Sequence, residues 1–219
     1  MAFDWKFALS IIPDLLNGLW VTVEVVVFGM ALALTLGLIW AICRRSSNVL
    51  ISWPVFIFVE FIRSTPLLIQ AYFLFYVLPE RGVVLSPFVT GAIALGLHYS
   101  AYTAEVYRAG IEAVPAGQWE AAKALNFSFT QTFSRVILPQ AIPKVIPVLG
   151  NYLIAMFKEV PILSAITLAE LLQAAKVIGS ETFRYLEPLT LVGLFFLILS
   201  LISSRLIDRL GRILTIRHA

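Results

Sequence analysis

The chain has 219 residues, of which 60% are hydrophobic and only 13% are charged, and its mean hydropathy is +0.91. Typical soluble chains carry about 25% charged residues, and a soluble domain of this length could not bury so much apolar surface. A lipid bilayer can solvate that surface in place of water. The composition therefore excludes an ordinary soluble protein and predicts an all-α integral membrane protein.

Five runs of mostly apolar residues follow one another, each near the roughly 20 residues that a membrane-spanning helix needs. They cover approximately residues 19–43, 51–78, 84–107, 141–157 and 188–207. Short amphipathic surface helices are expected over residues 3–16 and over residues 164–178, the second with Ser164 as its N-cap and Gly179 as its stop. No internal repeat or low-complexity segment is present, so we expect one transmembrane domain over residues 1–219 with five spans.

Lysine and arginine are distributed unevenly between the two sides that five spans define. The basic side holds Arg44, Arg45, Arg108, Lys123, Arg135, Lys144, Arg205, Arg209, Arg212 and Arg217. The opposite side holds Lys6, Arg81, Lys176 and Arg184. Because basic loops stay in the cytoplasm, we expect the N-terminus outside and the C-terminus inside. The net charge of +3 then reflects membrane topology, and the scatter of the basic residues argues against nucleic-acid binding.

A polar, alanine-rich segment at about residues 111–137 separates the third span from the fourth. Its first helix is expected to follow Pro115 and to end where Asn126 can adopt the left-handed conformation. Ser128 then offers an N-cap, with Gln131 three residues later to complete a capping box. A second helix is expected to end before Pro139, whose ring disfavours helix at the preceding residue. The segment therefore predicts two short helices that meet at a turn.

This helix-turn-helix is long for a loop, and long ordered loops are usually functional. Glu120 stands at the head of a smooth alanine surface, which suits an arginine or lysine on another protein. We therefore interpret the segment as a docking surface, with an idle surface loop as the alternative.

Ionisable side chains inside apolar spans also suggest function, because each costs roughly 2.5–3.5 kcal/mol at the centre of a membrane helix. Glu60 and Arg63 are three residues apart on one helix face and could neutralise each other, and Glu105 and Arg108 allow the same pairing. These pairs leave structural and functional alternatives open. His98 stands alone in the third span and is expected to be packed or hydrogen-bonded, not to act as a ligand.

Two helix breaks are expected at membrane depth, where broken helices are tolerated if they line a polar cavity. One lies at residues 63–66, and the other follows from three prolines at four-residue spacing within residues 139–147. Lys158 and Glu159 come next, and as neighbours they point to different faces and do not neutralise each other. A zwitterionic solute would need one cationic and one anionic group at such a place. We therefore predict a solute pathway lined by Ser64, Thr65, Lys158 and Glu159. A structural role at a subunit interface is the alternative.

The run from Glu120 to Pro139 resembles the cytoplasmic EAA signature of ABC importer permeases, which reads Glu-Ala-Ala, three residues, Gly, nine residues, Ile, one residue, Leu-Pro. Asn126 stands in place of the Gly, and Val136 in place of the Ile. Further motifs, similar to the polar amino-acid branch of that family, occur in order at residues 63–70, 101–111 and 158–163. Residues 183–188 resemble permeases for ectoine and hydroxyectoine uptake.

This resemblance implies the type I ABC importer permease fold and a place in the bacterial cytoplasmic (inner) membrane. Expected partners are a second permease subunit (itself or a paralogue), a cytoplasmic ABC ATPase dimer and an extracytoplasmic solute-binding protein. The solute would be a polar amino acid or a zwitterionic compatible solute such as ectoine or hydroxyectoine. In the family, the glutamate at the position of Glu120 meets a basic residue of the ATPase. The implied coupling helix comprises Glu120, Ala121, Ala122, Lys123, Leu125 and Asn126.

Several other classes of function lack support. No Gly-x-x-x-x-Gly-Lys-Ser/Thr phosphate loop occurs, so ATP would be bound by the partner ATPase and this subunit would need no cofactor. The single cysteine, Cys43, excludes an internal disulfide, and no metal site or catalytic nucleophile–base signature is evident. A stand-alone secondary transporter or channel would need internal repeats, and an intramembrane enzyme would need paired catalytic groups. Residues 1–6 lack a basic n-region, so no removable signal peptide is expected.

Overall fold

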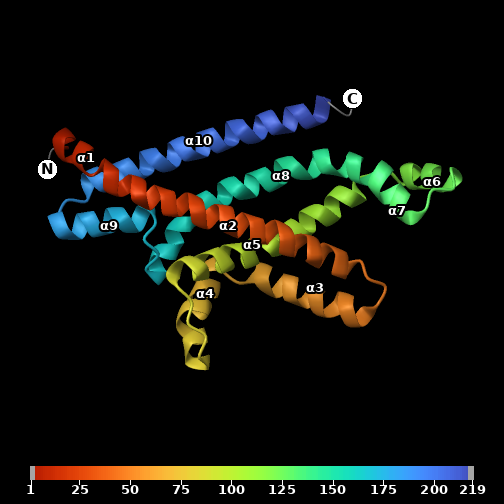
Figure 1. The fold of residues 1–219 in the computed structure, drawn as a ribbon, viewed down its shortest axis with the longest axis horizontal. Coiled ribbons are helices and arrows are strands. Elements are labelled where there is room, and N and C mark those ends of the chain that lie inside the picture. The colour runs from red at the N-terminus through yellow and green to blue at the C-terminus, as the bar shows by residue number, and fades with distance from the viewer. Residues whose placement is uncertain (1–2, 217–219) are drawn as a thin grey trace.

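The computed structural model describes residues 3–216, and every regular element within that range is helical (Figure 1). Residues 1–2 and Arg217, which entered the arguments on signal peptide and charge, lie outside it. The elements are α1 Trp5–Ser10, α2 Ile12–Arg44, α3 Val49–Ser64, α4 Leu67–Tyr72, a π-helix Phe73–Val77, a 3-10 helix Leu78–Arg81, α5 Pro87–Glu112, α6 Ala116–Ala124, α7 Phe129–Thr132, a π-helix Phe133–Ile137, α8 Leu138–Glu159, a 3-10 helix Val160–Ile166, α9 Leu171–Thr182 and α10 Leu186–Ile216.

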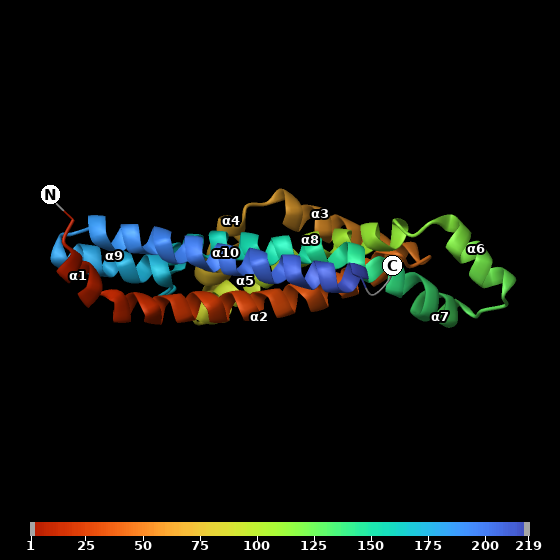
Figure 2. The same cartoon turned by 90° about the horizontal axis from the view of Figure 1, so that it is seen from above.

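The molecule is elongated, and its long helices run roughly along one axis (Figure 2). α1 and α9 lie at one end, and α6 and α7 lie at the other. This arrangement places the predicted docking segment beyond the end of the helical bundle.

Length and composition identify three membrane-crossing helices among the described residues: α2, Phe129–Ile166 and Leu186–Arg212. The second predicted span is a bent pair, since α3 and Leu67–Arg81 meet at 105°. Counting that pair as one span gives four. The third predicted span, α5, is a single helix of 26 residues but is not among these candidates, because its apolar run is interrupted by polar residues that neighbouring helices bury. The predicted count of five spans is therefore not established by length and composition.

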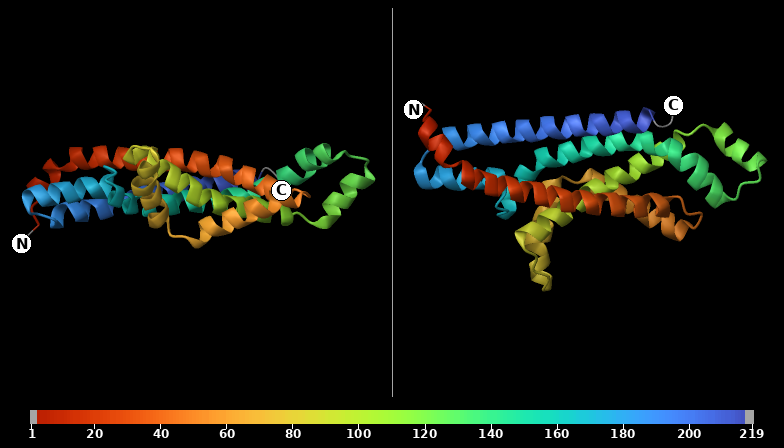
Figure 3. Two further views of the ribbon diagram at one scale, coloured as in Figure 1. Left: turned by 90° about the horizontal axis from the view of Figure 1, so that it is seen from below. Right: turned by 45° about the horizontal axis from the view of Figure 1, so that its top comes forward.

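The bend in the second predicted span has a local cause at Pro66. Its ring disfavours helix at the residue before it, and Thr65 is accordingly extended, with φ −111° and ψ 139°. Pro66 itself precedes α4, so its missing N–H breaks no internal helix bond. Figure 3 shows α4 and the turns after it projecting sideways from the bundle.

Two predicted surface helices were placed wrongly. In place of one helix over residues 3–16, α1 has six residues, and α2 begins at Ile12 because Pro13 occupies its first turn. In place of a helix starting at Ser164, a 3-10 turn intervenes and the side chain of Glu170 caps α9. Gly179 does not stop α9, because it lies inside the helix with the Tyr185 ring packed against it.

The packing of α2 on α5 is the most extensive in the bundle. It depends on Gly37, where an added Cβ would lie 1.9 Å from the Thr103 hydroxyl and 2.9 Å from the Ser100 carbonyl. The Thr103 hydroxyl donates to the Ala33 carbonyl at 2.8 Å, and the Trp40 indole donates to the Ser100 hydroxyl at 3.0 Å. Small residues that allow close backbone approach are typical of helix pairs in membranes.

Candidate docking island and solute pathway

We call residues 114–137 the docking island. Its first helix, α6, begins directly after Pro115, as predicted. Asn126 has φ 56° and is thus left-handed. The Phe127 amide donates to the Ala122 carbonyl at 3.1 Å and the Asn126 amide to the Lys123 carbonyl at 3.0 Å. These two bonds form a Schellman motif, so the predicted helix stop at Asn126 is confirmed.

The second helix begins as predicted but does not end as predicted. Ser128 and Gln131 form the capping box: the Ser128 hydroxyl accepts from the Gln131 amide, and the Gln131 side chain accepts from the Ser128 amide. The chain then continues through the π-turn Phe133–Ile137 into α8, so the expected end before Pro139 is wrong. Pro139 sits in the first turn of α8, and the π-turn changes the hydrogen-bond register ahead of it, with the Leu138 amide donating to the Phe133 carbonyl.

The island presents one face to solvent and packs another onto the bundle. Glu120 is exposed and forms no ion pair within residues 3–216. Leu125 and Phe129 are 68% and 72% exposed, so large apolar side chains also lie on the outer face of the island. Ala122 is only 2% exposed and packs within the island. Five of the six predicted docking residues, Glu120, Ala121, Lys123, Leu125 and Asn126, thus lie on the accessible surface.

A hydrogen-bond network of Thr65, Gln70 and His98, which we call the polar relay, spans the break between α3 and α4. The amide group of Gln70 donates to the Thr65 hydroxyl at 2.7 Å and to the Ile62 carbonyl at 2.9 Å. Its oxygen lies 3.3 Å from Nδ1 of His98 on α5. His98 is buried, so the prediction that it is packed or hydrogen-bonded is confirmed. The relay fixes the broken helix against α5.

Beside the relay, three tyrosine rings from α5 and α8 form what we call the tyrosine cluster: Tyr99, Tyr102 and Tyr152. The three ring-centroid distances are 6.1, 5.8 and 5.9 Å. The His98 ring lies 5.2 Å from Tyr102. On the α3 side, the Arg63 guanidinium lies 5.7 Å from the centroid of Tyr102. Aromatic faces attract cations, so the cluster combines apolar contact area with hydroxyls and a cation-binding character.

Two charged groups at the cluster retain unused hydrogen-bonding atoms. Arg63 pairs with Glu60 at 2.9 Å, yet its Nε is buried and makes no hydrogen bond within residues 3–216. The Glu159 Oε2 atom is likewise buried and unbonded there, and the Glu159 carboxylate interacts electrostatically with Tyr99. A buried polar atom without a partner is costly and calls for an explanation. A bound solute could supply the missing partners.

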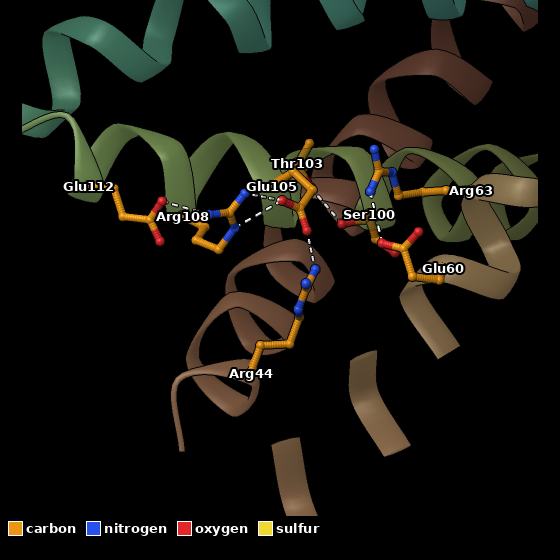
Figure 4. Close-up of polar contacts among 8 residues, drawn as sticks. All are labelled: Arg44, Glu60, Arg63, Ser100, Thr103, Glu105, Arg108 and Glu112. Atoms are coloured by element: carbon orange, nitrogen blue, oxygen red, sulfur yellow. Dashed lines mark hydrogen bonds and ion pairs between the residues drawn. The ribbon is translucent and has the colours of Figure 1, made fainter. Parts of the chain in front are cut away.

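A second group of charges joins α2 to α5 at the island end of the bundle (Figure 4). Glu105 accepts from Arg44 of α2 and from Arg108, whose Nη2 and Nε lie 2.7 and 2.9 Å from Oε2. Arg108 also pairs with Glu112 at 2.6 Å. The predicted pairing of Glu105 with Arg108 is therefore present, and Arg44 extends it between helices.

The four predicted pathway residues are not all brought together. Thr65 is joined to the tyrosine cluster through Gln70 and His98, and Glu159 reaches it through Tyr99. Ser64 and Lys158 are exposed. Sequence reasoning did not identify the tyrosines; only the three-residue spacing of Tyr99 and Tyr102 offered a signal, because it places them on one helix face.

Residues 183–188, which resemble ectoine permeases, lie at the end of the molecule opposite the island. Arg184 pairs with Asp4 at 3.2 Å and with Glu187 at 2.6 Å, and it lies over the Phe7 ring at 4.6 Å. A hydrogen bond from the Phe7 amide, together with Arg184, holds the pKa of the Asp4 carboxyl below its usual value. In this chain the segment therefore clamps α1 to α10.

Comparison with known proteins agrees with this geometry. Residues 33–215 match the family described as "Binding-protein-dependent transport system inner membrane component". A probable amino-acid ABC transporter permease protein of Sinorhizobium fredii is 52% identical over 93% of this chain and 88% of its own length. The L-cystine transport system permease protein of Bacillus subtilis is 35% identical over 96% and 93%.

The fold is also that of solved ABC importer permeases. A crystal structure described as an amino acid ABC transporter with histidines has a TM-score of 0.92 to this chain at 35% identity, covering 97% of this chain and 99% of that one. The all-helical type I importer permease fold that the motifs implied is therefore confirmed. This chain belongs to the family of inner membrane components of binding-protein-dependent transport systems, the permease subunits of ABC transporters.

Proposed function

We propose that this chain is the permease subunit of an ATP-driven importer for polar amino acids or closely related zwitterions. In this role it forms a solute pathway with a second permease subunit and takes its energy from an ATPase dimer docked on the island. The observation that carries the proposal is the island itself, a capped helix-turn-helix beyond the bundle with an exposed Glu120 that forms no ion pair with any described residue. A stand-alone transporter would have no use for such a surface.

The solute pathway is proposed to pass the tyrosine cluster. Arg63 and Glu159 carry opposite charges, and each retains a buried atom without a hydrogen-bond partner among the described residues. A zwitterion could place its carboxylate on Arg63 and its ammonium group on Glu159, with its apolar part against the tyrosine rings. Ser64 and Lys158, which are exposed, would act at the entrance of this pathway.

For the solute, the named relatives favour an amino acid, since one is a probable amino-acid permease and another belongs to an L-cystine system. Ectoine and hydroxyectoine are zwitterions that the same charge pair could accept. The segment that suggested them, residues 183–188, lies away from the tyrosine cluster and forms the clamp on α1. We therefore rank amino acids first and retain ectoine and hydroxyectoine as candidates.

The proposed orientation places the island in the cytoplasm, with the C-terminus on the same side and the N-terminus outside. The ends of α2 and α5 at the island carry Arg44 and Arg108, and Lys144 lies in an early turn of α8. Cationic residues are enriched on the cytoplasmic side of membrane proteins. The extracytoplasmic binding protein would then meet the end that holds α1 and α9.

The decisive experiment is solute uptake into proteoliposomes that contain this chain with its permease partner, ATPase and binding protein. Polar amino acids, ectoine and hydroxyectoine are supplied outside, with ATP enclosed or omitted. We expect uptake only with enclosed ATP, and we expect Glu120→Arg to lower it at least about tenfold by turning an attraction to a basic partner into repulsion. Asp208→Arg, a charge reversal at an exposed site on α10, should leave uptake near the wild-type rate.

Two results would reject the proposal. Uptake by this chain alone, indifferent to ATP, would establish a secondary transporter or channel. Normal uptake and ATPase binding in Glu120→Arg would remove the docking role of the island. For the solute pathway, Glu159→Gln should raise the concentration needed for half-maximal uptake by at least about tenfold, as expected when a charge-assisted hydrogen bond is lost. An unchanged value would place the pathway elsewhere.

A further inference from the structure

At the base of the docking island, one lysine side chain connects the two helices between which the island lies. The chain leaves α5 at Ala113 and returns through the π-turn to α8, and Lys144 lies in the second turn of that helix. The Lys144 ammonium group donates a hydrogen bond to the Ala113 carbonyl at 2.6 Å. The last carbonyls of a helix lack intrahelical partners and carry the negative end of its dipole. Lys144 therefore joins the start of α8 to the end of α5 at the point where the island begins.

Two further contacts hold the island to the start of α8. The Gln140 amide group donates to the Gln118 side-chain oxygen on α6 at 3.0 Å and to the Val136 carbonyl at 2.8 Å. A small apolar core, fully or largely buried, lies beneath them: Val114, Ile137 and Ala141, with Ile111, Trp119, Phe133 and Val136 packed around it. α6, the π-turn and the first turn of α8 are thus one packed unit, which Ile111 at the end of α5 also contacts.

Lys144 ties that unit to α5 just outside a close helix crossing. At Gly110 an added Cβ would lie 2.2 Å from Cγ2 of Val145, so the two helices touch one turn inward from the tie. Farther inward, α5 carries Tyr99 and Tyr102 and α8 carries Tyr152. A displacement of the island can therefore move both α5 and α8, the two helices that carry the tyrosine cluster, provided that the base of the island does not bend.

We propose that Lys144 is a positioning residue for energy coupling. It keeps the island at a fixed angle to α5 and α8, so that motion of a docked ATPase moves both helices together. This inference rests on the proposed function, because it requires an ATPase on the island. Lys144 is distinct from the docking surface itself, since it lies on α8 and its ammonium group is engaged with the α5 carbonyl.

The test uses the complete importer in proteoliposomes and compares solute transported with ATP hydrolysed. Lys144→Met removes the donor and keeps the apolar stem, whereas Lys144→Arg keeps a donor. We expect Lys144→Met to bind the ATPase normally and to lower solute transported per ATP about fivefold, a size suited to loss of one exposed charged contact at a helix end. Lys144→Arg should restore most of the ratio. Arg205→Met, at an exposed cation on α10, is the matched control and should keep the wild-type ratio.

A second measurement reports the position of the island without transport. Cys43 is the single cysteine of the chain, so Cys43→Ser gives a background for paired spin labels. With labels at Ala116 on α6 and Ser204 on α10, Lys144→Met should broaden the distance distribution and Lys144→Arg should restore it.

The possible outcomes separate this inference from the proposed function. If the wild-type importer takes up no solute with ATP, the proposed function fails and the coupling role falls with it. If the wild type transports and Lys144→Met matches it in both ratio and distance distribution, only the positioning role is overturned. A loss of transport that follows a parallel loss of ATPase binding would also overturn it, because Lys144 would then belong to the docking surface.

Discussion

The docking island and the tyrosine cluster are both polar regions of an apolar chain, but they are built by different kinds of contact. In the island, the contacts that shape the turn lie within six residues of one another: the Schellman bonds at Asn126 and the capping box at Ser128. In the tyrosine cluster, side chains from α5 and α8 meet across the bundle, with Arg63 of α3 beside Tyr102. The island is thus defined locally, and the cluster exists only when α5 and α8 are packed together.

Because of this difference, we expect different substitutions to disrupt the two regions. A substitution that separates two helices should destroy the cluster and leave the turns of the island intact. A substitution at an island cap should act on the island alone. The shape of the island therefore does not depend on how the helices around the cluster pack, while the cluster changes when those helices move.

The largest effect is expected for Gly37→Leu, which should disrupt the helix packing of the bundle and leave the turns of the island intact. Any side chain at this position collides with Thr103 and Ser100 and forces α2 away from α5. We expect a loss of more than about 4 kcal/mol of stability, enough to remove the folded protein from size-exclusion profiles in detergent. Gly193→Leu is the control, because among the described residues no atom other than its own adjoining helix backbone lies within 4 Å of its added Cβ. Equal yields of the two variants would contradict this account of the α2–α5 packing.

A smaller effect is expected for the charge group between α2 and α5. Glu105→Gln leaves Arg44 and Arg108 without their shared carboxylate, and the Glu105 side chain is only 20% exposed. We expect a loss of about 2–3 kcal/mol in denaturation from mixed micelles, since leaving a partly buried charge unpaired is costly. Glu112→Gln breaks a pair whose carboxylate is 55% exposed and should cost less than about 1 kcal/mol. Equal losses would show that burial does not set the strength of this group.

The distinction between contacts that are local in the sequence and contacts between distant helices also explains which features the sequence could predict. Asn126, Ser128 and Pro115 specify helix ends through their own chemistry, and the structure confirms all three. The end expected at Pro139 was wrong because a π-turn, which depends on packing of Phe133 and Ile137 against the island core, accommodates the proline. Local rules succeeded where the competing interactions were also local.

The tyrosine cluster and its polar neighbours were harder to predict because the residues are far apart in the sequence. Gln70 and His98 meet only after the break at Pro66 turns α4 toward α5, and Tyr152 reaches Tyr99 only through the packing of α8. The break itself was predictable from Pro66, yet its 105° angle was not. Ser64, chosen for its place beside the break, is exposed, because a position next to a kink does not determine which way a side chain faces.

Glu170 combines features of both regions, because it is a local helix cap, like Ser128 in the island, and is also buried between helices. The side chain is fully buried where α9 packs on α2. Its carboxyl accepts hydrogen bonds from the Leu172 and Gln173 amides in the first turn of α9, at 2.9 and 2.7 Å. Burial raises the pKa of this carboxyl from the ordinary 4.5 to about 7. Because the folded form holds its proton more tightly, the stabilisation is complete below about pH 4.5 and is lost as the pH rises through 7.

We therefore expect this group to lower the unfolding free energy by about 2 kcal/mol between pH 5.5 and pH 8. Glu170→Gln should remove that part of the pH dependence, measured as the shift in thermal midpoint between the two pH values. Glu181→Gln, on the exposed side of the same helix, should retain it. A steeper or unchanged slope in Glu170→Gln would assign the pH dependence to other groups.

The smallest effect is expected at Asn126, where the island departs from the glycine of the EAA signature. Asn126→Gly suits the φ of 56° and should change the protection of α6 amides in hydrogen exchange by less than about 0.5 kcal/mol. Asn126→Val places a β-branched side chain in the left-handed region and should lower that protection by about 1–2 kcal/mol. The α2 amides should be unaffected in both, because the turn is held by bonds within the island. Leu125→Val, at a neighbouring residue with φ −81°, is the control and should lose only a few tenths of a kcal/mol. Loss of protection in α2 together with α6 would mean that the island is not an independent local unit.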